Sequence, residues 1–212
     1  NRKFTVDAMD DYDTEHLAFG QLAGHFIKES VIPEIDAVRF SKYAQAAIGA
    51  GNTKAGAITD ATVLVQEIVD AVTAMEENEV PMEKVRLFIT PSAYNTILTL
   101  PLTESKQVFM NYFENKIHKV PTARFYTKID LLDGVTSGQE EGGYKKAADA
   151  EEINFLIVAS DAVIQGLKHV APKFIPAAIN QEADGDGYAY RVNGVEEIFD
   201  NKLAGIFVHT KA

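Results

Sequence analysis

Residues 13–48 read DTEHLAFGQLAGHFIKESVIPEIDAVRFSKYAQAAI, and this is the longest stretch of the chain that can form a single helix. In its first half, apolar residues recur at intervals of three and four, as in a helix with one buried face. These residues are Phe19, Leu22, Ala23, Phe26 and Ile27. Pro33 has no N–H to bond the carbonyl of Glu29, so a bend is expected just before it. Because the apolar pattern resumes after Pro33, the sequence predicts one long, bent helix of about 50 Å.

The composition is that of a folded, acidic protein. The 212 residues are 46% hydrophobic and 24% charged, enough for one domain or two small ones with a real core. The net charge of −11 and the lack of a basic cluster argue against a nucleic-acid-binding surface, because such a surface neutralises phosphates with Lys and Arg. The chain has no cysteine, which excludes disulfides and thiolate zinc sites and fits an intracellular origin. No apolar run approaches the roughly 20 residues of a membrane-spanning helix.

The segments around the long helix have recognisable start and stop signals. Residues 2–6 (RKFTV) predict a short strand before the helix. The glycine-rich GAGNTKAG, residues 49–56, predicts the end of the helix and a hinge or subdomain boundary. A second helix is predicted over residues 59–77, because Thr59 or Asp60 can cap it and one face is apolar. That face carries Ala61, Leu64, Ile68, Val72 and Met75.

The second half of the chain alternates short strands and helices. Strands are predicted at residues 85–90, 122–129 and 153–160, and helices at residues 91–98 and 103–117. The glycine-rich residues 133–152 have almost no large apolar side chain, so we expect a mobile loop or a segment used in contacts between subunits.

Near the C-terminus the sequence predicts β-structure. Residues 170–176 (VAPKFIP) predict an edge strand, because prolines are tolerated there. The pair Asn193-Gly194 predicts a tight turn between two antiparallel strands. The elements are interleaved without a regular strand–helix–strand repeat, so the fold class is α+β.

Two glycine-containing segments resemble ligand loops but do not complete the pattern. Gly51 and Gly56 have the spacing of a phosphate-binding loop, yet Ala57 and Ile58 stand where Lys and Ser or Thr are required. Residues 182–187 (EADGDG) resemble the first half of a calcium loop, but Asn193 occupies the position of the bidentate glutamate. A hinge and an ordinary turn are the simpler interpretations.

The remaining candidates for chemistry are also ordinary structural residues. His16 and His25 are nine residues apart and face opposite sides of a helix, so they cannot share a metal ion. Ser92 follows a helix-starting proline and lacks the surroundings of a nucleophile elbow. The sequence therefore nominates no catalytic, cofactor-binding or metal-binding residue.

Three segments carry a resemblance to a known family. They are FTVDAMDDYDTEHLAFGQLAGHFIKESVIPEIDAVRFSKYA (residues 4–44), VPMEKVRLFITPSAYNTIL (residues 80–98) and DNKLAGIFVH (residues 200–209). In this order they resemble the major capsid proteins of tailed phages and prophages. The resemblance implies the HK-97-like fold, in which a long spine helix joins a peripheral domain to an axial domain. Family members carry an N-terminal arm and an extended loop before the FTVD strand, and this chain begins there, at Asn1, so we expect a trimmed subunit.

The resemblance also implies a domain division, a function and partners. The peripheral strand and spine helix would occupy residues 1–50, the axial domain mainly residues 51–160, and strands returning through both domains residues 161–212. The chain would be a non-enzymatic subunit that forms pentamers and hexamers of an icosahedral head around viral DNA. It would act with scaffolding and portal proteins, in the virion and earlier in the bacterial cytoplasm, without a cofactor.

Two other functions fit the residues. An encapsulin-like shell protein would share the fold, and a groove for a cargo peptide on the inner surface would favour it. A soluble enzyme with a dispersed site would instead have a deep pocket with converging polar groups and shifted pKa values.

Overall fold

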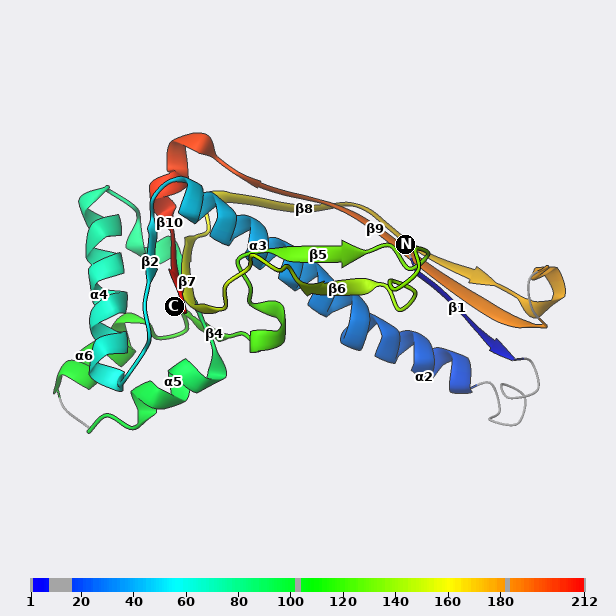
Figure 1. The fold of residues 1–212 in the computed structure, drawn as a ribbon, viewed down its shortest axis with the longest axis horizontal. Helices are drawn as coiled ribbons and strands as arrows, with labels where there is room; N and C mark the ends of the chain where they lie inside the picture. The colour runs from blue at the N-terminus through cyan, green and yellow to red at the C-terminus, as the bar shows by residue number, and fades with distance from the viewer. Residues whose placement is uncertain (1, 8–16, 102–103, 182–183, 212) are drawn as a thin grey trace. The chain divides into compact units, whose positions relative to one another are not determined.

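A computed structural model describes residues 2–7, 17–101, 104–181 and 184–211 (Figure 1). The chain divides into two compact units. The first unit comprises residues 1–36, 131–145 and 165–195, and the second comprises residues 37–130, 146–164 and 196–212. Among the described residues, none of the helices combines the length and apolar character that crossing a membrane requires.

The long predicted helix is present and continues through Pro33. It consists of α2 (Leu17–Phe26), a π-helical turn (Ile27–Val31) and α3 (Ile32–Gly49), while residues 13–16 lie outside the described part. The N–H of Ile32 bonds to the carbonyl of Ile27, five residues back. This wider turn lies directly before Pro33, where a proline cannot complete the regular helical bonding. The irregularity expected at Pro33 is therefore a π-helical turn, and the helix does not end there.

The first unit contains a three-stranded sheet in the order β1-β9-β8. β1 runs antiparallel to β9, with Phe4 opposite Tyr188. The rings of Phe4 and Phe26 lie 5.4 Å apart and those of Phe4 and Tyr188 5.3 Å apart, so aromatic packing attaches α2 to this sheet. The strands are β1 (Arg2–Asp7), β8 (Val163–Ile175) and β9 (Gly185–Ile198). β8 lies at the edge of the sheet, as predicted for residues 170–176.

The turn predicted at Asn193-Gly194 is wrong. Both residues lie inside β9, which is a single strand of 14 residues. The chain reverses earlier, through the 3₁₀ turn Ala177–Ile179, where Asp186 accepts a 2.7 Å hydrogen bond from the N–H of Ala177. An Asn-Gly pair is only a local preference, and continuation of a long strand overrides it.

The second unit is built on a five-stranded mixed sheet in the order β2-β10-β7-β3-β4. β7 is antiparallel to both neighbours, whereas the outer pairs β2 with β10 and β3 with β4 are parallel. The strands are β2 (Thr53–Ala55), β3 (Val85–Ile89), β4 (Ile117–Lys119), β7 (Ile153–Ala159) and β10 (Ile206–Thr210). β7 is buried on both faces, in agreement with its continuous apolar sequence.

Helices cover this sheet and complete the core. The ring of Phe40 in α3 lies 5.2 Å from Phe88 in β3 and 5.1 Å from Phe125. The helices are α4 (Ala61–Glu77), α5 (Pro91–Leu98) and α6 (Glu104–Tyr112). The predicted apolar face of α4 is buried, and Asp60 caps the helix by accepting hydrogen bonds from Thr62 N and Val63 N. Thr90 caps α5, and Pro91 occupies its first position.

Two boundaries differ from the sequence prediction. Residues 49–56 do more than end the long helix, because they include β2, which pairs with β10. The helix predicted over residues 103–117 ends at Tyr112, and Ile117 begins β4. Asn115 has a φ of 59°, a left-handed conformation that a helix cannot continue through.

The strand predicted over residues 122–129 is also wrong. Pro121 is followed by the 3₁₀ turn Thr122–Arg124, and Phe125 is fully buried. The apolar side chain of Phe125 thus anchors a turn in the core and does not belong to a strand. Tyr126 forms an isolated β-bridge with Glu152, and a regular strand begins only at β5 (Ile129–Leu132), which pairs with β6 (Gly143–Lys146) inside the predicted loop of residues 133–152.

Candidate functional site

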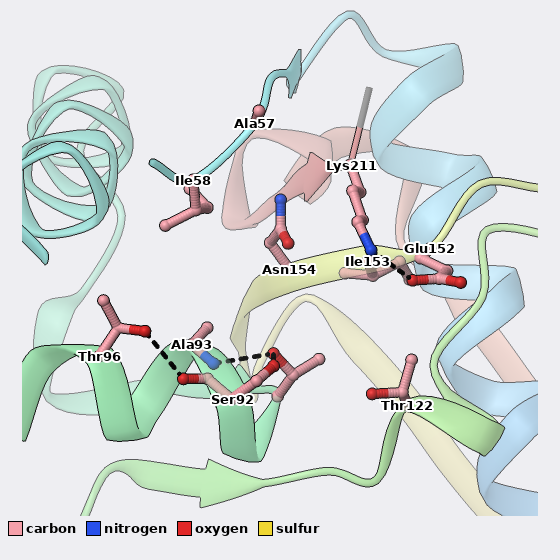
Figure 2. A pocket seen from close by; sticks show the side chains of 11 residues that line it. Ala57, Ile58, Ser92, Ala93, Thr96, Thr122, Glu152, Ile153, Asn154 and Lys211 are labelled. Atoms are coloured by element: carbon pink, nitrogen blue, oxygen red, sulfur yellow. Dashed lines mark hydrogen bonds and ion pairs between the residues drawn. The ribbon is translucent and has the colours of Figure 1, made fainter. Parts of the chain in front are cut away.

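One concavity of the second unit is a pocket of about 270 Å³ (Figure 2). It lies between the segment after β2, the start of α5, the beginning of β7 and the residue that follows β10. The residues that line it are Ala57, Ile58, Thr90, Ser92, Ala93, Thr96, Thr122, Glu152, Ile153, Asn154 and Lys211. Its wall is rich in hydroxyl groups and carries one acid and one base, so it is the first place to look for chemistry.

The hydroxyl groups of this pocket serve the local structure of α5. Thr90 Oγ1 accepts a 3.3 Å hydrogen bond from Ala93 N and lies 3.3 Å from Ser92 Oγ. Thr96 donates its hydroxyl hydrogen to Ser92 O at 3.0 Å, in the regular pattern of a helix surface. Ser92 is therefore a helix-start residue, as predicted, and its neighbour is another hydroxyl and not a base that could activate it.

The two charges of the pocket neutralise each other. Lys211 Nζ lies 3.3 Å from Glu152 Oε2, and both side chains are partly open to solvent. Such a pair contributes little to stability and presents no net charge to a ligand. The pocket thus has neither an activated nucleophile nor a strong attraction for an anion or a cation.

The side chain of Asn154, in the pocket wall, also contacts His209. His209 is a buried residue that the sequence analysis did not single out. Asn154 Nδ2 donates to Gly56 O at 3.3 Å and lies 3.1 Å from His209 Nδ1. Since this Asn nitrogen can only donate, His209 Nδ1 must accept, and the imidazole is neutral. The ring stacks on Phe155 with centroids 5.0 Å apart. The contact links β7, β10 and the segment after β2.

The environment of His209 holds it in this neutral form. Burial lowers the pKa of His209 below its ordinary 6.5; the positive charge of Lys54 acts in the same direction, and the negative charge of Glu67 opposes it. With 1% of its surface exposed, the ring cannot reach a ligand in solution. His209 is therefore a structural group. A histidine within a strongly apolar final strand is the sequence signal that could have identified it.

The other residues considered from the sequence are also explained by structure. Gly51 has a φ of 78° in the turn after α3, whereas Gly56 N donates to Thr210 O at 3.0 Å beside β10. Asp186 binds the backbone of the β8–β9 connection, and Asn193 lies within β9. His25 is exposed beside Glu29 at 3.4 Å.

His16 lies outside the described residues. Within the described residues, no three His, Asp or Glu side chains are grouped as metal ligands.

Two further pockets of the second unit differ in character. One, of about 290 Å³, contains Asp161, whose carboxylate lies 3.0 Å from Lys202 Nζ and 3.5 Å from Lys84 Nζ. These lysines lower the pKa of Asp161 and keep it ionised. The other, of about 240 Å³, is mainly apolar and lies between α4, α5 and α6. Neither combines a nucleophile with a base.

The described surface exposes many large apolar side chains. In the first unit these are Leu22, Ile32, Leu131, Val135, Leu167, Val170, Phe174 and Ile179, and in the second Ile48, Val69, Leu98, Ile164 and Phe199. Single exposed apolar residues are common on proteins, but several on one strand, as on β8, are typical of contact surfaces.

Comparison with solved structures identifies the fold. A structure from Mycobacterium phage Che8 matches 98% of this chain and 68% of its own, with a TM-score of 0.63 and 11% identity. The capsid structure of Staphylococcus phage Andhra matches 100% of this chain and 69% of its own, with a TM-score of 0.57 and 13% identity. This chain has the fold of phage capsid proteins. The capsid structure of the cyanophage P-SCSP1u also has this fold. It matches 100% of this chain and 71% of its own, with a TM-score of 0.55 and 12% identity.

The capsid fold confirms the α+β class and the HK-97-like architecture predicted from the sequence. The chain spans about two thirds of the length of each of these three structures. No family model and no curated protein matches the sequence, in keeping with identities of only 11–13% to the structural matches.

Proposed function

We propose that this chain is a structural, non-enzymatic subunit of the icosahedral head of a tailed phage or prophage. The observation that carries the proposal is the match of nearly the whole chain to three phage structures, two of them capsid structures. In this function, subunits assemble into pentamers and hexamers that enclose the viral DNA. The subunit works in the virion, and in the bacterial cytoplasm during assembly, with scaffolding and portal proteins as further partners.

The physical properties of the chain support this function. An acidic protein with a net charge of −11 is repelled by packed DNA and so suits the wall of a container. In this proposal the first unit (residues 1–36, 131–145 and 165–195) corresponds to the peripheral domain, and the second unit (residues 37–130, 146–164 and 196–212) corresponds to the axial domain. The apolar side chains exposed on each unit supply lateral contacts that symmetry repeats.

The test is assembly of the complete gene product, expressed with the products of its neighbouring genes and viewed by negative-stain electron microscopy. We expect closed shells of uniform diameter. A product that stays a monomer or simple dimer over a wide range of concentrations would contradict the proposal. The contents of purified native particles separate the two kinds of shell, because DNA indicates a phage head and a packaged protein indicates an encapsulin-like compartment.

A further inference from the structure

The edge strand β8 combines features that predispose a strand to bind another chain. It is 13 residues long and lies at the end of the three-stranded sheet of the first unit (Figure 1). Leu167 and Val170, on its opposite faces, are 51% and 44% exposed. Natural edge strands are usually short or protected by charge, because a long apolar edge associates with other chains.

β8 is also locally basic in an acidic protein. Lys168 and Lys173 are exposed, and the sequence contains no Asp or Glu from residue 162 to residue 181. The net charge of the whole chain is −11. A partner for β8 should therefore combine an apolar side chain with carboxylates.

The loop between β5 and β6 has this complementary character. Residues 129–144 contain four acidic residues (Asp130, Asp133, Glu140 and Glu141) and no Lys or Arg. Val135 in the loop is 84% exposed, the highest value among the large apolar side chains of the described surface. The loop thus presents one apolar side chain flanked by carboxylates.

Hydrogen bonds within the loop hold Val135 in this position. Asp133 Oδ1 accepts 2.8 Å hydrogen bonds from Val135 N and Thr136 N, and Gln139 N donates to Thr136 O at 2.8 Å. These hydrogen bonds form a local turn around Val135, within a segment that is expected to be mobile as a whole.

We propose that the β5–β6 loop of one copy of this chain docks on strand β8 of a second copy. Val135 packs against Val170, and the carboxylates of Glu140 and Glu141 face the ammonium groups of Lys168 and Lys173. Within one chain both surfaces are exposed, so the contact is between copies. It joins two different surfaces and can therefore close a ring of subunits. The inference rests on the proposed shell function, in which many weak lateral contacts act together.

Charge reversal in the complete gene product tests the ion pairs. K168E/K173E and E140K/E141K should each reduce the fraction of protein in shells at least about tenfold, because like charges then face each other. The combined fourfold variant should recover to within about twofold of the original. E77K/E114K, which reverses two exposed carboxylates of the second unit, is the control and should have little effect at 0.15 M salt, where its change in net charge is largely screened. Thermal unfolding of the unassembled subunits checks that each variant folds.

Disulfide trapping tests the apolar contact independently, because the chain has no cysteine of its own. V135C and V170C proteins are mixed and oxidised with copper phenanthroline, and V135C with V69C is the control pair. Val69 is 43% exposed, nearly the same as Val170 at 44%, so both cysteines are equally accessible. We expect the first pair to form mixed disulfide dimers at least about tenfold faster.

The outcomes separate this contact from the proposed function. Equal crosslinking of the two pairs, or failure of the fourfold variant to recover assembly, would overturn the contact even if closed shells form. Specific crosslinking by a protein that forms no shell would uphold the contact and contradict the shell function.

Discussion

At the scale of single residues, Gly185 has no room for a side chain. A Cβ atom at Gly185 would overlap the carbonyl oxygen of Val6, which lies across the β1–β9 pairing. A Cβ atom added to Gly166, in β8, would meet no atom within 4 Å. The two glycines therefore differ in steric surroundings, although both lie in strands of one sheet.

The first prediction compares these two glycines. Gly185→Ala should lower the free energy of unfolding by about 2 kcal/mol, since the strands must separate locally to admit the methyl group, whereas Gly166→Ala should change it by less than about 0.5 kcal/mol. Urea unfolding measures both. Equal effects of the two substitutions would contradict the predicted overlap.

The second prediction concerns the buried His209. Its folded-state pKa is lowered, so the unfolded chain binds the proton more readily. The contribution of His209 to stability is therefore fully present above pH 6.5, the ordinary value, and declines as the pH falls below it. Glutamine cannot ionise. Between pH 7 and pH 5, the unfolding free energy of His209→Gln should therefore depend less steeply on pH than that of the original protein. The difference in slope should correspond to the uptake of up to about one proton on unfolding.

Carboxylates whose pKa is lowered, such as Asp161 and Glu140, act below their ordinary values of 3.8 and 4.5, which lie below this pH range. Denaturant unfolding at several pH values gives the two slopes. Parallel curves for the original protein and His209→Gln would show that the histidine titrates alike in the folded and unfolded states.

At the scale of elements, the third prediction concerns the start of α4. Asp60 Oδ1 accepts hydrogen bonds of 2.8 Å from Thr62 N and 3.0 Å from Val63 N. Asp60→Ala should cost about 1 kcal/mol, because two helix-terminal N–H groups lose their acceptor. Thr73→Ala, an exposed substitution in the middle of the same helix, is the control and should be close to neutral. A loss for Asp60→Ala no greater than the control would show that water replaces the cap.

The fourth prediction concerns residues 133–152, which we expect to be the most mobile internal segment. β5 and β6 form an isolated two-stranded sheet, which is marginally stable in water. Brief digestion with trypsin should therefore cut first at Lys145 or Lys146. Trypsin also has sites at Arg39 and Lys42 within α3, whose buried face should make this helix resist, so early cleavage there would contradict the prediction.

The elements predicted correctly from the sequence are those whose signals are local. α4 has an apolar face within its own 17 residues and its capping residue, Asp60, directly before them, and β7 is a continuous apolar strand. The predictions failed where distant contacts decide the conformation. Phe125 anchors a turn because the core holds its ring, and Gly194 lies within a strand because β9 continues past it. The spacing of apolar residues along the sequence contains no information about such distant contacts.

The candidate site follows the same division. Ser92 could be recognised as a helix-start residue because its proline neighbour is adjacent in sequence. The contact between Asn154 and His209 could not be predicted, since the residues are 55 positions apart and the strand pairing brings them together. The edge position of β8 was predicted from its prolines, but its pairing with β9 and the exposure of Leu167 and Val170 become visible only in the structure.

At the scale of the whole molecule, net charge and local charge would act in opposite directions in the proposed shell assembly. Each subunit carries a net charge of −11, so copies repel one another at long range. Lys168 and Lys173 attract carboxylates only at contact distance. Salt shortens the Debye length from about 30 Å at 0.01 M to about 8 Å at 0.15 M, which screens long-range repulsion more than contact pairs.

The fifth prediction follows from this difference. The yield of closed shells from the complete gene product should rise as ionic strength increases from 0.01 M to 0.15 M. It should then level off or fall toward 1 M, where the Debye length of about 3 Å also weakens the contact pairs. Light scattering during assembly measures the yield. A subunit with E77K/E114K has a net charge that is less negative by four, so it should reach its highest yield at a lower salt concentration. A yield that falls steadily from the lowest salt would mean that ion pairs between subunits outweigh their net repulsion at every distance.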